Sequence, residues 1–216
     1  AFCVILNMNR NASESRPVSK ERVEKSNDSP KNTKEIEIPF SDKPKTLQDE
    51  VFLKFLQSSL GDILEDELLL ASKELTGELK EDFIVCCSLS NLKVLILHDN
   101  NLTGRIPKTL SQLSNLRGLA LSKNNLVGNI PREFFNLYNL LYLRLEENEI
   151  TGIIPSEISS LSNLLQLRLN NNKLIGSIPP VISNLYNLKN LYLQNNHLTG
   201  CIPKELFNLT NLAVLH

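Results

Sequence analysis

The sequence has no tryptophan, one methionine and few aromatic residues, which make up 6% of its 216 residues. Basic and acidic side chains nearly balance, so the formal net charge is -1 and no general attraction to nucleic acid or to an anionic membrane is expected. No apolar run approaches the roughly 20 residues that a membrane-spanning helix needs. We therefore expect no nucleic-acid partner and no membrane span within these residues.

The four cysteines follow no pattern typical of a disulfide framework or a metal site. Cys86 and Cys87 are adjacent, Cys3 lies near the start of the sequence, and Cys201 lies more than a hundred residues beyond the pair. A nucleophile elbow, a phosphate-binding loop and a zinc-protease helix are also missing from the sequence. We predict no cofactor, no metal and no catalytic residues, and therefore a protein that is not an enzyme.

A leucine returns every 24 residues, at Leu89, Leu113, Leu137, Leu161, Leu185 and Leu209. The first copy of this unit reads LSNLKVLILHDNNLTGRIPKTLSQ and the fifth reads LYNLKNLYLQNNHLTGCIPKELFN. Five complete copies occupy residues 89–208, and a sixth is truncated at residue 216. Self-similarity at a fixed period of this length is typical of solenoids, in which stacked repeats bury one continuous core.

Each repeated position has a physical role. In Leu95-Ile96-Leu97 and its equivalents, alternate residues point to opposite faces of a strand, so the leucines face inward and the residue between them faces solvent. An asparagine such as Asn100 follows, whose amide can both donate and accept hydrogen bonds. A glycine then supplies a turn open to positive φ, and a proline ends the extended segment. Lys108–Gln112 and its equivalents are expected to be short helical returns.

The consensus LxxLxxLxLxxNxLxGxIPxxLxxL resembles the plant-type leucine-rich repeats of receptor-like kinases, receptor-like proteins and polygalacturonase-inhibitor-like proteins. The resemblance covers residues 89–216. It implies an α/β solenoid, a curved right-handed array with a parallel β-sheet on its concave face, across which partners bind. The sequence is expected to continue beyond His216, because the last repeat stops before any covering helix.

Two further regions are predicted before the repeats. Residues 1–46 are expected to be a disordered tail, because residues 10–46 are polar and cannot bury enough surface to offset their ordering entropy. The first six residues, AFCVIL, fit either the end of a secretory signal or a short apolar start without that role. Residues 47–88 are expected to form a helical N-terminal cap and a degenerate repeat, Leu75–Leu79, since solenoid ends need covering. A partner-binding amphipathic surface is the alternative. The helical spacing is carried by Leu47, Val51, Phe55, Leu56, Leu60, Ile63, Leu64 and Leu68.

The outward strand positions form columns on the expected concave face. Neighbouring strands lie about 4.8 Å apart, so Arg144 and Arg168 should stand side by side. Aromatic and arginine side chains together are typical of binding hot spots. The predicted partner-binding residues are Tyr142, Arg144, Glu146, Arg168, Asn170, Tyr192 and Gln194. We expect the arginines to bind a carboxylate of a peptide by bidentate hydrogen bonds. In the alternative, Glu146 and Glu147 only neutralise them in a solvated sheet.

The sequence as a whole predicts non-enzymatic recognition of a protein or peptide. The favoured context is the extracellular or cell-surface part of a receptor-like protein in signalling or defence. The alternative is a soluble scaffold or inhibitor, secreted or cytoplasmic, that binds a protein partner through the same sheet. Asn101 and Asn208 begin Asn-x-Thr triplets and are predicted glycosylation sites if the chain is secreted. His98 and His197 are expected to be isolated and exposed, and Cys201 to be a free surface thiol.

Overall fold

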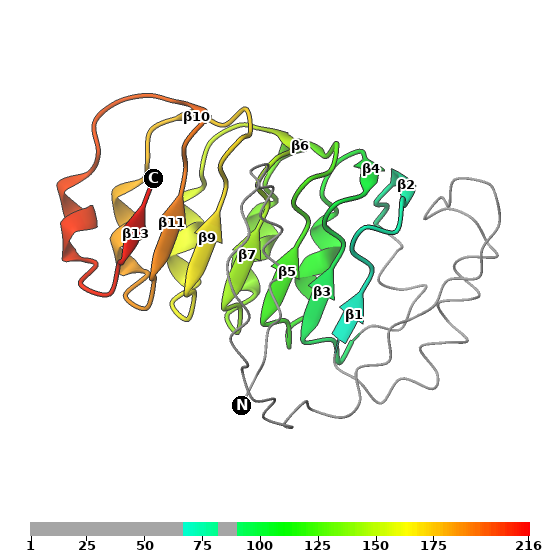
Figure 1. The fold of residues 1–216 in the computed structure, drawn as a ribbon. Helices are drawn as coiled ribbons and strands as arrows, with labels where there is room; N and C mark the ends of the chain where they lie inside the picture. Colours follow the sequence, from blue (N-terminus) through cyan, green and yellow to red (C-terminus); the bar gives the residue numbers. More distant parts are fainter. Residues whose placement is uncertain (1–66, 82–89) are drawn as a thin grey trace, which may run out of the picture. The chain divides into compact units, whose positions relative to one another are not determined.

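A computed structural model describes residues 67–81 and 90–216, which form a curved stack of repeats (Figure 1). One parallel sheet of seven strands runs through the stack in the order β1-β3-β5-β7-β9-β11-β13. Its strands are β1 (Glu67–Leu69), β3 (Val94–Ile96), β5 (Gly118–Ala120), β7 (Tyr142–Arg144), β9 (Gln166–Arg168), β11 (Asn190–Tyr192) and β13 (Val214–Leu215). Each repeat contributes one strand, and the predicted leucine-rich-repeat solenoid with its parallel sheet is confirmed.

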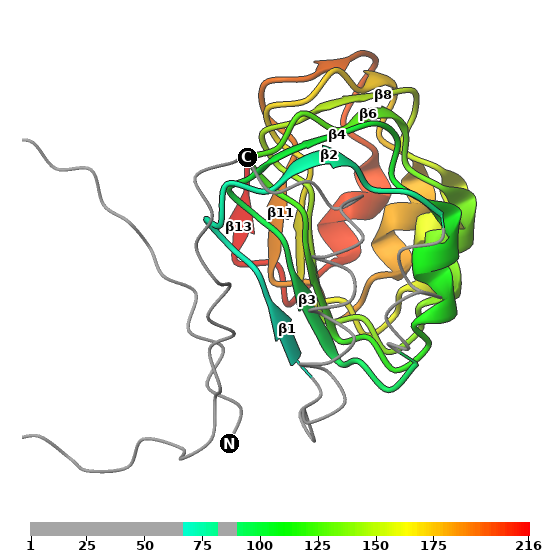
Figure 2. The same cartoon turned by 90° about the vertical axis from the view of Figure 1, so that its right-hand side faces the viewer.

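The return segments are 3-10 helices on the side of the stack opposite this sheet (Figure 2). Each follows a proline in extended conformation, as Pro107 precedes η1, and ends at the leucine that opens the next repeat. They are η1 (Lys108–Gln112), η2 (Arg132–Asn136), η3 (Ser156–Ser160), η4 (Pro180–Asn184) and η5 (Lys204–Asn208). The predicted helical return at Lys108–Gln112 is therefore confirmed in the tighter 3-10 form.

Short strands between the main sheet and the 3-10 helices form three two-stranded parallel sheets. They pair β2 (Thr76–Glu78) with β4 (Asn101–Thr103), β6 (Val127–Asn129) with β8 (Glu149–Thr151), and β10 (Ile175–Gly176) with β12 (His197–Leu198). At the turn between β8 and η3, Gly152 has φ +81°, and an added Cβ would lie 2.5 Å from Asn129 Oδ1. Only glycine fits this turn, as its place in the repeat predicts.

The core lies between the main sheet and the 3-10 helices. Leu95 and Leu97 are fully buried whereas Ile96 between them is only partly buried, as strand alternation predicts. Leu110 of η1 and Phe134 of η2 close the core from the opposite side and are also fully buried. A buried phenylalanine where other repeats carry leucine or isoleucine shows that this position tolerates a change of side-chain volume between repeats.

A ladder of asparagines, all buried except the partly buried Asn196, joins the repeats. Asn148 Nδ2 donates to the carbonyls of Leu121, Leu145 and Glu146 at 3.0, 3.2 and 3.3 Å, while its Oδ1 accepts from Leu126 N at 3.0 Å. Equivalent bonds form at Asn100, Asn124, Asn172 and Asn196. Each amide therefore satisfies backbone groups of its own repeat and of the preceding one where the chain leaves the sheet.

A second row of asparagines, which the sequence analysis did not single out, ties the opposite edge of the repeats. Asn163 Nδ2 donates to the carbonyl oxygen of Tyr138, one repeat earlier, at 2.8 Å. The same bond recurs at Asn115, Asn139, Asn187 and Asn211. These side chains are exposed, so their bonds compete with water and fix the edge more weakly than the buried ladder does.

The first described repeat departs from the prediction. Leu68 pairs with Leu95 in β1–β3, which is a 27-residue offset in place of 24. The prediction that Leu68 continues a helix is therefore wrong, because residues 67–69 form a strand. In the segment predicted to be a degenerate repeat, Leu75 is fully buried and Gly77 has φ +92°. The predicted tail, the cap through residue 66, Leu89, and Cys86 and Cys87 lie outside the described residues.

Two smaller predictions concern surface chemistry and membrane insertion. Cys201 is a free, exposed thiol, as expected. Among residues 67–81 and 90–216, no helix has the length and apolarity required to cross a bilayer.

We predict that Asn148→Ala lowers the free energy of unfolding by about 2–4 kcal/mol, because it leaves buried backbone groups of two repeats without partners. The matched control is Asn163→Ala in the exposed row, for which a loss below about 1 kcal/mol is expected. Urea unfolding of the two variants measures both values. Equal losses would contradict the greater structural weight assigned to the buried ladder.

Candidate functional site

The outward positions of the main sheet line up in columns across the repeats. One column contains Val94, Gly118, Tyr142, Gln166, Asn190 and Val214, and the next contains Ile96, Ala120, Arg144, Arg168 and Tyr192. Arg144 and Arg168 are direct register partners, so their predicted placement side by side is confirmed. The second column changes along the sheet from apolar side chains to two guanidiniums and then to an aromatic ring.

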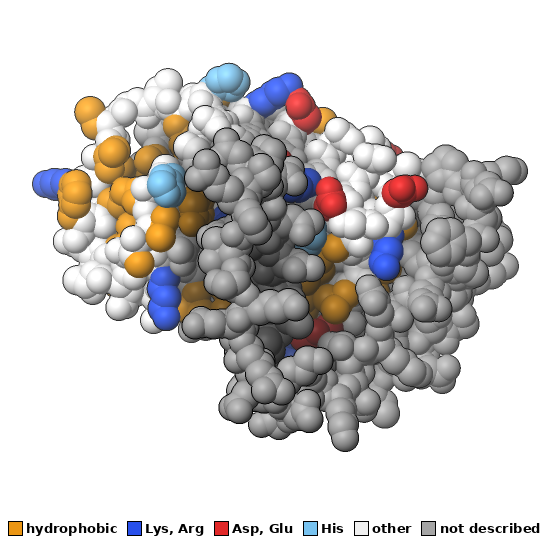
Figure 3. All heavy atoms as spheres, viewed as in Figure 1, with side chains coloured by type: hydrophobic (Ala, Val, Ile, Leu, Met, Phe, Trp, Pro, Cys, Tyr) orange, Lys and Arg blue, Asp and Glu red, His pale blue; other side chains and the backbone are white. Residues whose placement is uncertain are grey.

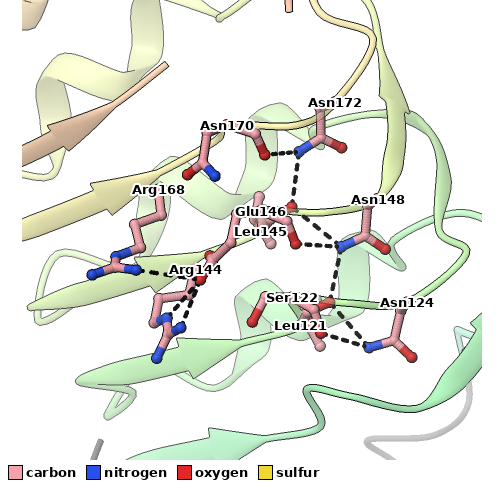
Figure 4. A network of polar contacts seen from close by, with 10 residues as sticks. All are labelled: Leu121, Ser122, Asn124, Arg144, Leu145, Glu146, Asn148, Arg168, Asn170 and Asn172. Carbon is pink, nitrogen blue, oxygen red and sulfur yellow. Dashed lines mark hydrogen bonds and ion pairs between the residues drawn. The ribbon is translucent and has the colours of Figure 1, made fainter. Parts of the chain in front are cut away.

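The carboxylate of Glu146 lies between the two arginines (Figure 4). Arg144 Nε and Nη2 both donate to Glu146 Oε1, at 3.0 and 2.6 Å. Arg168 Nη1 lies 3.9 Å from the same oxygen. The side chain of Glu146 is 4% exposed, whereas those of Arg144 and Arg168 are 20% and 23% exposed. Glu146 therefore occupies the position at Arg144 where a carboxylate from a partner would be expected to bind.

An aromatic side chain supports the second arginine. Arg168 Cζ lies 4.5 Å from the centroid of the Tyr192 ring, a distance at which a guanidinium is attracted to the ring face. Tyr192 in turn stacks on His216, with ring centroids 5.4 Å apart and an interplanar angle of 22°. Glu146, Arg168, Tyr192 and His216 thus form a chain of contacts across four successive repeats that holds the Arg168 side chain in place.

The other predicted site residues lie beside this chain of contacts. Tyr142 is partly buried and pairs with Gln166 in the neighbouring column. Asn170 is buried at 9% exposure, and its carbonyl oxygen accepts a bond from Glu147 N at 3.0 Å. Gln194 is exposed, and its carbonyl oxygen accepts from Asn171 N. Gln166, at 8% exposure, is a polar residue of this face that the sequence analysis did not select. Its outward column position was the available signal.

The third residue after each main strand from β3 to β11 adopts a left-handed backbone conformation. Glu147 has φ +57° and Lys123 has φ +52°, which is unfavourable for side chains with a Cβ. Asp99, Asn171 and Asn195 take the same conformation with residue types that tolerate it better. This turn directs the chain from the concave face to the asparagine ladder, and it leaves Glu147 exposed while Glu146 is buried.

His98 differs from the expectation of an isolated, exposed side chain. It is partly buried, and its pKa lies below the ordinary value of 6.5. Burial is the largest cause, and the nearby positive charge of Arg144 lowers the pKa further, against smaller opposing effects of Asp99 and Glu146. His197 is exposed, as expected.

Asn101 and Asn208 are both exposed, as are Thr103 and Thr210, which complete their triplets. Within the described part of the chain, no group of three or more histidine, cysteine, aspartate or glutamate side chains is placed to hold a metal ion.

Comparison with family models matches the leucine-rich repeat region over residues 77–216. Comparison with curated proteins gave no match. Among solved structures, the chain is similar to the plant peptide hormone receptor RGFR1 in complex with RGF2, with 37% identity, a TM-score of 0.61 and coverage of 64% of this chain. It is also similar to the ectodomain of the plant membrane receptor kinase GASSHO1/SCHENGEN3 from Arabidopsis thaliana, in complex with CASPARIAN STRIP INTEGRITY FACTOR 2, with 34% identity, a TM-score of 0.62 and coverage of 65%.

A third similar structure is PEPR1-AtPEP1, with 30% identity, a TM-score of 0.60 and coverage of 69% of this chain. The chain spans only 22%, 17% and 24% of the lengths of these three structures, in the order given. The similarity therefore concerns the repeats.

We predict that Arg144→Gln raises the pKa of His98, but only part of the way to its ordinary value, because burial is the larger cause. Titration of the histidine ring signals by NMR measures the shift, with Arg132→Gln on η2 as a control that leaves it unchanged. Since folding lowers the pKa of His98, the unfolded chain takes up the proton first as pH falls. Neutral His98 therefore contributes to the free energy of unfolding in full above about pH 6.5, and this contribution declines as the pH falls below that value. If the pKa of His98 is unchanged or lower in Arg144→Gln, the positive charge of Arg144 does not lower it.

Proposed function

Because the chain belongs to the leucine-rich-repeat proteins, we propose that it recognises a protein or peptide partner across the concave face of its seven-stranded sheet, without catalysis. The recognition surface is centred on β7, β9 and β11, and comprises Tyr142, Arg144, Glu146, Arg168, Asn170, Tyr192 and Gln194.

The observation that carries this proposal is the support given to Arg168. Its guanidinium lies over the Tyr192 ring and beside Glu146, so the side chain is ordered before any partner arrives. An arginine that is already held in place loses less conformational entropy on binding than a free one. Arginine and tyrosine are also enriched among the residues that dominate binding energies. A shallow polar sheet with such anchors suits a macromolecular partner better than a small substrate that must be enclosed.

The proposed biological context is the extracellular part of a receptor-like protein. Two observations support it. The similar structures include the plant peptide hormone receptor RGFR1 in complex with RGF2, and the GASSHO1/SCHENGEN3 receptor kinase ectodomain in complex with CASPARIAN STRIP INTEGRITY FACTOR 2. The Asn101 and Asn208 triplets are exposed and accessible to the glycosylation that accompanies secretion. A soluble scaffold or inhibitor would use the same face, and differs in location rather than in mode of binding.

Partner recognition can be tested without a known ligand. Peptides are selected from a random display library on the immobilised full chain, and their affinities are then measured for two double variants. We expect Arg168→Ala with Tyr192→Ala to weaken binding at least about thirtyfold, the size of one interface hot spot. The matched control, Arg132→Ala with Tyr138→Ala, changes the same residue types outside the main sheet, in η2 and in the segment between η2 and β7, and should leave affinity unchanged. If the control variant lost affinity and the Arg168/Tyr192 variant kept it, the concave face would be rejected as the binding surface.

Glycosylation tests the proposed location separately. We predict that the protein isolated from its source carries N-linked glycans at Asn101 and Asn208, because both acceptor side chains are exposed. Mass spectrometry of the protein before and after enzymatic removal of glycans measures occupancy at each position. Unmodified asparagine at both positions would speak for a cytoplasmic protein that binds its partner through the same face.

A further inference from the structure

The centre of the concave face contains four buried polar atoms that have no hydrogen-bond partner: Glu146 Oε2, Gln166 Oε1, Asn170 Oδ1 and Arg168 Nε. Gln166 and Arg168 lie in β9, whereas Glu146 and Asn170 lie two residues beyond the ends of β7 and β9. Buried polar atoms nearly always have a partner, since leaving one unpaired costs about 1–3 kcal/mol. Four such atoms gathered on one face indicate a position that a ligand completes. From them we propose that the site receives a neutral carboxamide, the side-chain group of asparagine or glutamine, from the bound partner.

The hydrogen-bonding character of two of these atoms is fixed. Glu146 Oε2, on an ionised carboxylate, can only accept a hydrogen bond, and Arg168 Nε can only donate one. The amides of Asn170 and Gln166 can rotate to suit a ligand, so they do not decide its chemistry. A group that fits must present a hydrogen-bond donor to Glu146 and an acceptor to Arg168. A carboxamide carries both within one planar unit.

Charge argues against the two ionised alternatives. Arg144, Arg168 and Glu146 together carry a net charge of +1. A carboxylate would be drawn by this charge, but its oxygens would face the unpartnered oxygen of Glu146 and leave it without a donor. An ammonium group could donate to Glu146, but it would meet two guanidiniums and leave Arg168 Nε unsatisfied. Of these three side-chain groups, the neutral amide alone pairs both atoms without placing like charges together.

This inference deepens the proposed recognition function and rests on it. It also revises the ligand expected from the sequence, since Glu146 already engages the two nitrogens of Arg144 that would bind a carboxylate. A carboxamide would lie between Glu146, Asn170 and Arg168. Gln166 lies in β9, two residues before Arg168. There it can accept an N–H from the main chain of an extended peptide.

The test compares three capped peptides on the full chain at pH 7: acetyl-Gly-Gln-Gly, acetyl-Gly-Glu-Gly and acetyl-Gly-Lys-Gly. All three end in an N-methylamide, so that only the central side chain can supply a primary amide. The readout is the NMR signal of Arg168 Nε–H, assigned by its loss in Arg168→Lys. We expect the Gln peptide to shift this signal and to bind at least about tenfold more tightly than either charged peptide, as expected where a buried polar group is left unpaired.

The matched variants are Glu146→Gln and Glu147→Gln, which make the same chemical change at a buried and a neighbouring exposed position. The preference for the Gln peptide should be lost in the first and kept in the second. Equal or tighter binding of the Glu or Lys peptide by the unmodified chain, or no shift of the Arg168 signal by any of the three, overturns the carboxamide assignment. Because the three peptides are compared on the unmodified chain, misfolding of Glu146→Gln cannot obscure the result. The recognition function would still be supported if the library-selected peptides lost affinity for Arg168→Ala with Tyr192→Ala but not for the control Arg132→Ala with Tyr138→Ala.

Discussion

The structure depends on the register between neighbouring repeats. A single repeat exposes one side of its inward leucines, and these are buried only when the next repeat stacks on it. Hydrophobic contact alone is non-directional and would tolerate sliding. The buried asparagines remove that freedom, because each amide must meet backbone groups of two repeats at once. A displacement of one residue would leave these groups unpaired in the interior.

This register also places the functional residues. Outward side chains separated by 24 residues in the sequence become neighbours about one strand spacing apart. Arg144 and Arg168 meet in this way, and so do Arg168 and Tyr192. The site is therefore built on the main sheet itself. Its residues occupy the outward positions, at which the repeat pattern imposes no residue type. The backbone under them is held by the leucine, asparagine and glycine positions, at which the pattern does impose one.

The sequence predicted the fold because the same constraints return in every copy. Leucine alternation gave the strands, and the asparagine and glycine positions gave the turns. The prediction failed at Leu68, where the first repeat is three residues longer and the apolar spacing fits a helix as well as a strand. It also missed the partial burial of His98, which depends on neighbours from other repeats. The hydrogen bonds that Arg144 donates to Glu146 could be considered in advance but not decided, because a long side chain can adopt several rotamers.

The left-handed residue at the end of each main strand has a consequence for how such a surface can change. Lys123 and Glu147 occupy a backbone conformation that favours asparagine, aspartate or glycine, so the turn is held by the repeat rather than by its own residue. A whole 24-residue unit could be duplicated or removed beside the site and would carry this turn with it. The array would lengthen or shorten by one strand, while the contacts among Glu146, Arg168 and Tyr192 would stay as they are. Solenoids of this kind can therefore alter the reach of a binding face without altering the chemistry at its centre.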